Sequence, residues 1–464
     1  MKKLLLTAAA LPFLSIAAFT PSPAQISQQQ VERLREAALK DELAWDITEG
    51  LTTEVGPRLA GTEAEARART WAVARLKALG FQNVRVENFD MPVWVRGVER
   101  AEILAPFPQP LIVTALGNSG ATPASGVTAE VIGFESVAAL EAAPNESVRG
   151  KIVFVTHRMV PTTDGVGYGQ FGAPRRQGPT IASRKGAAAI VVRSIGTDYH
   201  RNPHTGGQNF PQGVTPIPAG ALSLPDSEQL ERILKRGRPV TMRLTLTPRN
   251  TGIHQSGNVI AEIPGRDPSL PVVMAACHLD SWDLGTGAID DGAGCGITAA
   301  AAKRVGDAGK PLRTIRLVWF GAEEVGLLGG LDYRMKHRDE KHAVIAESDT
   351  GADRVWRFQS RVSPAAQPVV DRIGRALAPL GIVTGSNKEA EGSDISVLTA
   401  IGFPTFELSQ DATRYFDYHH TPDDTLDKVD PVQLRQNVAA WTIMLAIAAN
   451  EPGEFGPVIT AGAQ

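Results

Sequence analysis

Residues 278–291 read His-Leu-Asp-Ser-Trp-Asp-Leu-Gly-Thr-Gly-Ala-Ile-Asp-Asp, so one imidazole and several carboxylates follow directly after an apolar run. The preceding residues 270–277 are short, apolar and rich in Val and Ala, which is typical of a buried strand in a parallel sheet. His278 then lies at the carboxyl end of that strand. Because open α/β sheets bind ligands at the carboxyl ends of their strands, this stretch predicts a functional site.

Three more apolar runs end before residues of the same kinds. They are residues 313–320, followed by Glu323 and Glu324, residues 342–346, followed by Glu347 and Asp349, and residues 404–408, followed by a loop with Tyr418, His419 and His420. Helix-like segments alternate with these strands. The alternation predicts an α/β fold with a mostly parallel mixed sheet flanked by helices.

Composition divides the chain into four parts. Residues 1–24 have a basic start, an apolar stretch and a small-residue cleavage site. They predict a secretory signal peptide, and therefore an exported protein, periplasmic or extracellular, without a membrane anchor. Residues 107–252 hold strand-like pieces between long Gly, Pro and Asn loops, which predicts an inserted β-rich domain. The catalytic domain is then divided between residues 25–106 and 253–464.

Periodicity predicts the elements at both ends of the catalytic domain. Apolar residues at helical spacing indicate amphipathic helices over residues 27–56, 62–80 and 431–449. Alternation, with Val and aromatic residues, indicates strands over residues 81–89 and 91–104.

The charge and the cysteine count exclude other classes. A net charge of −3 gives no indication of a nucleic-acid partner. Cys277 and Cys295 are the only cysteines, which excludes a disulfide-based scaffold. The sequence leaves open whether they pair with each other, and we favour small buried packing residues.

The strand-end residues make up a set of zinc ligands. Zinc binds His nitrogen and carboxylate oxygen, and a catalytic site keeps a position open for water. A two-zinc site needs a bridging carboxylate, two further ligands for each metal, and a carboxylate base that does not ligate. Our assignment is Asp290 as the bridge, His278 and Asp349 on one metal, Glu324 and His420 on the other, and Glu323 as the base.

Side-chain direction refines this assignment. Neighbouring side chains on an extended segment point opposite ways, so Glu324 can bind metal while Glu323 reaches the water. For the same reason we expect His419 not to reach the metal that His420 binds. Asp280 is the expected acceptor for the N–H of the first histidine ligand.

Each of these motifs alone is common in loops, turns and charged helices, and only their combination predicts chemistry. The sequence has no His-Glu-x-x-His helix and no Gly-x-Ser-x-Gly elbow. Residues 292–296, Gly-x-Gly-x-Gly, open a predicted helix, and we interpret them as close helix packing. His200 and His204 have the spacing of a metal pair but lie in a predicted loop, where substrate contact or an ordinary surface position is favoured.

With these motifs the chain resembles the co-catalytic di-zinc aminopeptidase family. The residues that carry the resemblance are 55–62, 278–283, 287–292, 323–324, 347–349, 391–395 and 419–421, with 148–152 and 217–221 in the insert. The resemblance implies the zinc-dependent exopeptidase fold, two Zn²⁺ ions per chain and a protease-associated domain as the insert. It also implies a cis peptide between Asp290 and Asp291.

The resemblance also suggests substrate contacts. Many relatives carry Tyr before the last His ligand, where it stabilises the oxyanion, but here His419 has that position. His419 and Tyr418 are therefore the oxyanion candidates. Glu391 or Asp394 is expected to hold the substrate's ammonium group, with an ordinary loop turn as the alternative.

Together these residues predict an exopeptidase that hydrolyses the N-terminal bond of short peptides or dipeptides through a metal-bridging hydroxide, with Glu323 as general base. A carboxypeptidase is the alternative, with Arg354, Lys388 or Arg414 for the free carboxylate. The complete ligand set argues against a one-zinc enzyme that catalyses glutaminyl cyclisation, and against a binding protein without catalytic activity. The expected partners are the short peptide and, in a homodimer, a second copy of the chain.

Overall fold

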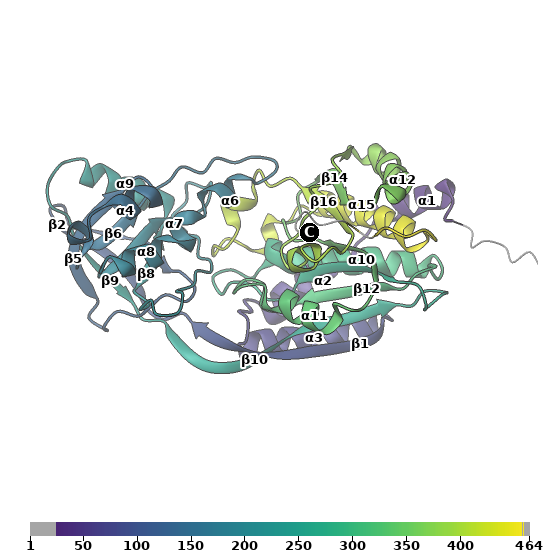
Figure 1. Cartoon of the computed structure of the whole chain (residues 1–464), viewed down its shortest axis with the longest axis horizontal. Helices are drawn as coiled ribbons and strands as arrows, with labels where there is room; N and C mark the ends of the chain where they lie inside the picture. The colour runs from purple at the N-terminus through teal and green to yellow at the C-terminus, as the bar shows by residue number, and fades with distance from the viewer. Residues whose placement is uncertain (1–24, 457, 459–464) are drawn as a thin grey trace, which may run out of the picture.

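Two eight-stranded sheets, one in each of two units, organise the chain (Figure 1), which the computed structural model describes over residues 25–456 and 458. The strand order in the larger unit is β1-β10-β12-β11-β13-β16-β14-β15. These strands are β1 (Gln82–Val95), β10 (Arg249–Ile263), β11 (Val272–His278), β12 (Ile315–Phe320), β13 (His342–Glu347), β14 (Val355–Arg361), β15 (Val383–Thr384) and β16 (Thr405–Gln410).

The larger sheet is mixed, with a parallel centre. Strands β12, β11, β13 and β16 run parallel to one another, as do β14 and β15 at one edge. The pairs β1–β10, β10–β12 and β14–β16 are antiparallel. The predicted α/β fold with a mixed sheet is confirmed, and the four central strands end at the same edge.

Helices cover both faces of this sheet. They are α1 (Gln28–Ala38), α2 (Leu43–Gly50), α3 (Glu63–Ala78), α10 (Ala293–Asp307), α11 (Leu328–His337), α12 (Gln367–Leu377), α13 (Ser396–Thr399), α14 (Tyr415–Tyr418) and α15 (Pro431–Ala449). Residues 27–56 form two helices and a π-helical turn (Leu51–Val55) rather than one helix. Helix α15 is buried nearly all round, because it packs among α1, α10 and α12, so the prediction that it is amphipathic is wrong.

Strand β11 lies in the core. Its residues Val273, Ala275 and Cys277 pack toward α10 and α15, while Met274 and Ala276 pack on the opposite face with β12 and α11. Burial on both faces explains the uninterrupted apolar run that precedes His278.

Helix α10 packs closely on its neighbours. At Gly296 a Cβ atom would lie 2.5 Å from the carbonyl oxygen of Ala44 in α2, which confirms close packing as the role of the glycines in residues 292–296. Cys277 and Cys295 are both fully buried and form a disulfide, with their Cα atoms 5.3 Å apart. The interpretation of these cysteines as unbonded packing residues is therefore wrong.

The smaller unit contains the second sheet, in the order β3-β2-β9-β5-β6-β7-β8-β4. Its elements are β2 (Glu99–Ala105), β3 (Gln109–Leu111), β4 (Val113–Ala115), β5 (Val127–Phe134), α4 (Val137–Ala142), α5 (Asn145–Val148), β6 (Ile152–Val155), α6 (Gly167–Phe171), α7 (Ala173–Arg176), α8 (Gly178–Arg184), β7 (Ala189–Arg193), β8 (Ala219–Leu222), α9 (Leu224–Leu234) and β9 (Thr241–Leu246). Because β2 pairs with β3 and β9, this unit begins before residue 107, where the predicted insert starts.

The long strands β1 and β10 lead from the larger unit toward the smaller one (Figure 1). The predicted signal peptide, residues 1–24, lies outside the described residues. Within residues 25–456, no helix has the length and apolar character needed to cross a membrane.

Candidate metal centre

The predicted ligands converge where the four central strands end. His278 Nε2, at the end of β11, lies 3.0 Å from Asp290 Oδ1 and 3.3 Å from Asp349 Oδ1. These atoms form one group of three that is compact enough to hold a metal ion. The structure thus brings together the residues assigned to the first metal.

The other oxygen of Asp290 faces a second group. Asp290 Oδ2 lies 3.2 Å from Nε2 of His420, and that nitrogen lies 2.9 Å from Glu324 Oε2. Asp290 therefore presents one oxygen to each group, which is the position that a bridging carboxylate requires. The peptide between Asp290 and Asp291 is cis, as the family resemblance implies.

His419 lies closer to this centre than expected. Its Nε2 is 3.4 Å from Asp290 Oδ2, and its ring stacks on that of His420 with 3.5 Å between centroids. Because His420 has a φ of 62°, in the left-handed region, the alternation of an extended segment does not apply. The reasoning that the two imidazoles point opposite ways is therefore wrong, although only His420 is in contact with Glu324.

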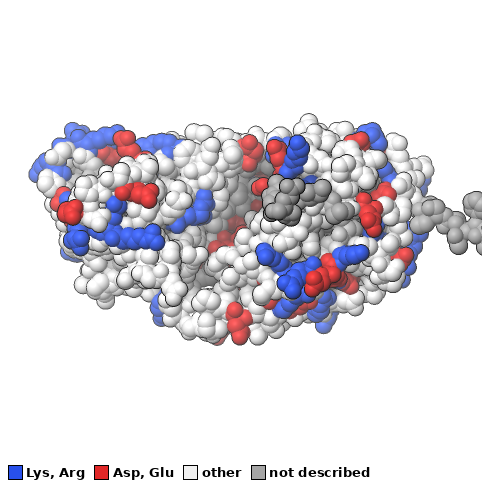
Figure 2. All heavy atoms as spheres, viewed as in Figure 1, with Lys and Arg blue, Asp and Glu red and all other residues white. Residues whose placement is uncertain are grey.

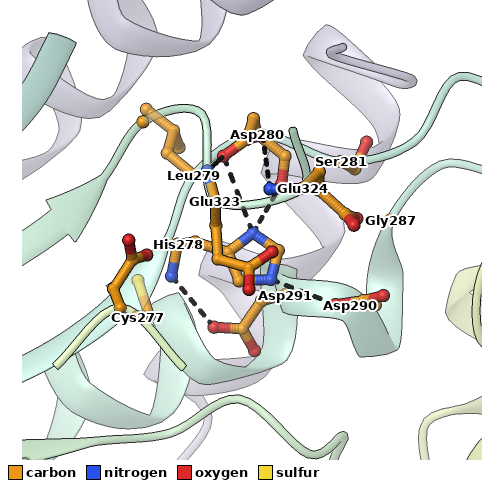
Figure 3. Close-up of polar contacts among 12 residues, drawn as sticks. Cys277, His278, Leu279, Asp280, Ser281, Gly287, Asp290, Asp291, Glu323 and Glu324 are labelled. Atoms are coloured by element: carbon orange, nitrogen blue, oxygen red, sulfur yellow. Dashed lines mark hydrogen bonds and ion pairs between the residues drawn. The ribbon is translucent and has the colours of Figure 1, made fainter. Parts of the chain in front are cut away.

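Asp280 acts through two different groups (Figure 3). Its carbonyl oxygen lies 3.0 Å from His278 Nδ1, whereas its carboxylate is 3.8 Å from that nitrogen. A proton on Nδ1 leaves the Nε2 lone pair free for a metal. The carboxylate instead accepts the backbone N–H groups of Glu323 at 3.0 Å and Glu324 at 3.4 Å. The expected hydrogen bond from His278 is therefore accepted by the backbone carbonyl of Asp280, and its carboxylate orients the Glu pair instead.

The electrostatics of this region fit divalent cations. The buried carboxylates are Asp280, Asp290, Asp291, Glu324, Glu347, Asp394 and Asp424. Within the described residues their ion pairs are with histidines alone, and Asp290 Oδ2 has no hydrogen-bond donor. Burial raises the pKa of Glu324 to about 7 and that of Glu347 to about 8. Such a concentration of buried negative charge is costly without cations, and nitrogen and oxygen ligands suit zinc.

Arg58, in the family-like segment 55–62, fixes the loop between His278 and Asp290. It is fully buried and donates hydrogen bonds to three carbonyl oxygens of that loop, those of Leu279 (2.5 Å), Thr286 (2.6 Å) and Gly287 (2.9 Å), and to that of Gly56 in its own segment (3.4 Å). A long-range contact of this kind leaves no periodic signal in the sequence.

Two aspartates that the sequence analysis did not single out as functional hold the backbone around the bridge. Asp424 accepts the N–H groups of Ala288 and Ile289, both at 2.7 Å, and burial raises its pKa to about 7. Asp291 accepts the N–H groups of His278 and Gly294, at 3.2 and 3.1 Å. The only signal for Asp424 is its place four residues after His420.

The predicted ammonium and oxyanion contacts are mostly absent from the site. Glu391 is exposed, and Asp394 is fully buried, accepts the N–H of Gly330 at 3.1 Å and does not line the cleft described below. Burial raises the pKa of Asp394 well above its usual range. Tyr418 lines a separate small cavity beside Lys428. Of these candidates, only His419 faces the cleft.

A cleft of about 680 Å³ lies over the metal centre, between the two units. Figure 2 shows it as a hollow with acidic side chains inside and basic side chains on the wall of the smaller unit. Glu323 and the predicted ligands other than His278 line one side, and the residues Asn118, Tyr168, Arg175, Arg176 and Gln208 line the other. The predicted carboxylate-binding residues Arg354, Lys388 and Arg414 are exposed and do not line it.

His204 joins the two units. It is buried, with Nε2 2.5 Å from Asp198 Oδ2 and Nδ1 2.6 Å from the carbonyl oxygen of His419. His200 lies 2.9 Å from the carbonyl oxygen of Asp417. The preferred interpretation as substrate contacts or ordinary surface residues is therefore wrong for His204, which supports a histidine of the metal centre.

The family model described as peptidase family M28 matches residues 258–444, which include every predicted ligand. Carboxypeptidase Q of Mus musculus is 34% identical over 403 residues, covering 86% of this chain and 84% of that protein. The chain belongs to peptidase family M28. The metal-binding motifs resemble carboxypeptidase Q in particular, and this match confirms that resemblance.

Solved structures of M28 peptidases agree with this assignment. A peptidase M28 precursor from Shewanella amazonensis is 46% identical, with a TM-score of 0.91, covering 93% of this chain and 99% of that one. A zinc aminopeptidase from Bacillus subtilis shares the fold at 20% identity, with a TM-score of 0.63, covering 90% of this chain and 97% of that one.

Proposed function

We propose that this M28 peptidase is an exported two-zinc exopeptidase, which removes the N-terminal residue from short peptides or splits dipeptides. The observation that carries the proposal is Asp290, which presents one oxygen to His278 and the other to His420, beside Glu323, whose carboxylate forms no ion pair within the described residues. The similarity to carboxypeptidase Q and to a zinc aminopeptidase supports it. Export rests on the composition of residues 1–24.

His278, Asp349 and one oxygen of Asp290 would hold one zinc, and His420, Glu324 and the other oxygen of Asp290 would hold the second. The bound ions would lower the pKa of a water molecule and polarise the scissile carbonyl.

Glu323 is the group that moves the proton. It takes a proton from the attacking water and returns it to the leaving amine. Burial among acidic neighbours, including Asp349 and Glu324, raises its pKa well above the usual range. The carboxylate of Asp280 fixes the backbone of Glu323 and so directs this side chain into the cleft.

The smaller unit limits the length of the substrate. It closes one side of a cleft whose volume lies within the range of small-ligand sites, about 300–1,000 Å³. This unit has a sheet of its own and interrupts the catalytic unit, which supports its interpretation as the protease-associated domain.

Elemental analysis, together with substrates blocked at either terminus, tests the proposal. We expect two zinc ions per chain, hydrolysis of Ala-Ala, and no hydrolysis of its N-acetylated form. Glu323→Gln should keep both zinc ions while kcat falls by about 10³-fold, within the usual range for general bases. Loss of activity on C-amidation alone would indicate a carboxypeptidase and overturn the N-terminal assignment. A protein with neither zinc nor hydrolysis would be a binding protein on a peptidase fold.

A further inference from the structure

Arg175 is a buried cation on the cleft wall that has no acidic partner. It lies in α7 of the smaller unit and is 6% exposed. Its Nη2 donates to the hydroxyl of Tyr168 at 2.7 Å and its Nη1 to the carbonyl oxygen of Thr205 at 3.2 Å, while Nε has no partner. No carboxylate in the described part of the chain forms an ion pair with it. Because buried arginines are normally paired, this guanidinium is suited to an anion from outside the chain.

Arg176 adds a second cation beside it. The two guanidinium groups lie 5.1 Å and 6.0 Å from the centroid of the Tyr168 ring, and Arg176 also makes no ion pair among the described residues. Its Nη2 donates to the carbonyl oxygen of Gly169 at 2.9 Å. Both arginines line the cleft that contains Glu323.

The arginine pair lies close to the metal centre. The Tyr168 ring packs edge-on against His419, with 4.9 Å between centroids. The N–H of Thr205, whose carbonyl binds Arg175, donates to the carbonyl oxygen of His420 at 3.0 Å. The neighbouring Gly206 makes room for this guanidinium, since a Cβ atom there would lie 2.0 Å from Nη1 of Arg175.

We propose that Arg175, assisted by Arg176, binds the free α-carboxylate of the substrate and makes the enzyme selective for dipeptides. This inference rests on the proposed function. In a dipeptide the carboxylate belongs to the residue directly after the scissile bond, about 3.8 Å further along the Cα trace. Guanidinium and carboxylate groups pair in a planar, two-point geometry, so an amide or a third residue is a poorer match.

A binding measurement tests this subsite independently of catalysis. The probes are Ala-Ala with a CH₂–NH group in place of the scissile amide, and the C-amide of that compound, titrated calorimetrically into the zinc-loaded protein. We expect the acid to bind about 10- to 100-fold more tightly than the amide, as for a charge-assisted pair. Arg175→Gln should abolish this preference, Arg176→Gln should reduce it, and Arg236→Gln, an exposed arginine of the same unit, should keep it.

The outcomes distinguish the two proposals. Equal binding of acid and amide by the wild type, or a preference that survives in both cleft variants, overturns the carboxylate subsite. If Arg175→Gln does not fold, as shown by circular dichroism, Arg176→Gln decides. A clear preference for the acid without hydrolysis of Ala-Ala supports the subsite but refutes the peptidase function. Hydrolysis of Ala-Ala and its C-amide at equal kcat/KM refutes the subsite and leaves the peptidase intact.

Discussion

Replacing Asp280 with asparagine keeps the shape of a buried side chain but turns one of its acceptors into a donor. In the wild type both oxygens accept backbone N–H groups, from Glu323 at 3.0 Å and from Glu324 at 3.4 Å. In Asp280→Asn the amide nitrogen must face one of these donors. The shorter bond should keep the oxygen, so the clash falls on the N–H of Glu324, which is a metal ligand in our assignment.

The magnitude follows from the bond that is lost. A hydrogen bond to a charged group contributes about 1.5–3 kcal/mol, and each 1.4 kcal/mol is a factor of about ten. We therefore expect the affinity for one of the two zinc ions to fall about 10- to 100-fold, which agrees with the usual effect of removing a group that holds a metal ligand in place. At saturating zinc, kcat should fall less, because the backbone of Glu323 is still held.

The assay is a stepwise chelator titration of zinc content, with kcat/KM measured at each step. Asp283→Asn is the matched control, since Asp283 lies in the same loop but pairs with Arg96 at 2.8 Å. If Asp280→Asn keeps both zinc affinities and only kcat falls, the substitution displaces Glu323 and not Glu324. The assumption that the oxygen stays with the N–H of Glu323 is then wrong. If neither quantity changes, the carboxylate does not orient the Glu pair.

Three further predictions follow from the same contacts. Arg58→Met leaves the carbonyls of Leu279 and Thr286 without a donor, whereas that of Gly287 keeps the N–H of Gly292, so the free energy of unfolding in urea should fall by about 2 kcal/mol or more. Chelation should lower Tm, and zinc at about 1,000 times its Kd should restore about 4 kcal/mol of stability, because the buried carboxylates regain their cations. Burial opposes the charge on His337, but its hydrogen bonds to Glu340 and Glu87 prevail and raise its pKa to about 9. The contribution of this charged histidine to the free energy of unfolding should be complete below about pH 6.5 and lost as the pH rises through 9. Urea unfolding of His337→Gln should not show this pH dependence.

The convergence of the predicted ligands could be anticipated from the sequence because it depends on local features. They lie at the carboxyl ends of buried strands or in the loops after them, and parallel strands that end at one edge bring such residues together. The directions of side chains were less predictable. The left-handed backbone of His420 turns its ring onto that of His419, and a single φ angle leaves no periodic signal. Asp394 is buried and accepts a hydrogen bond from an N–H group of α11, which is distant in sequence.

The cleft residues of the smaller unit could not be predicted from the sequence for a related reason. Tyr168 and Arg175 lie more than a hundred residues before the first predicted ligand, in helices α6 and α7 of the smaller unit, so only the way the two units meet brings them to the cleft. The candidates Arg354, Lys388 and Arg414 lie on the unit that carries the ligands, and their side chains are exposed.

The contact between the units is part of the metal centre as well as one wall of the cleft. The carbonyl oxygens of both adjacent histidines are held from the smaller unit, that of His419 by His204 at 2.6 Å and that of His420 by the N–H of Thr205 at 3.0 Å. Asp198 in turn holds the other nitrogen of His204 at 2.5 Å. The ligands that follow β11, β12 and β13 need only the larger sheet, whereas the loop with His420 is fixed from both sides. An insert that served only as a lid would not need these buried bonds, so the position of the predicted ligand His420 depends on the docking of the smaller unit.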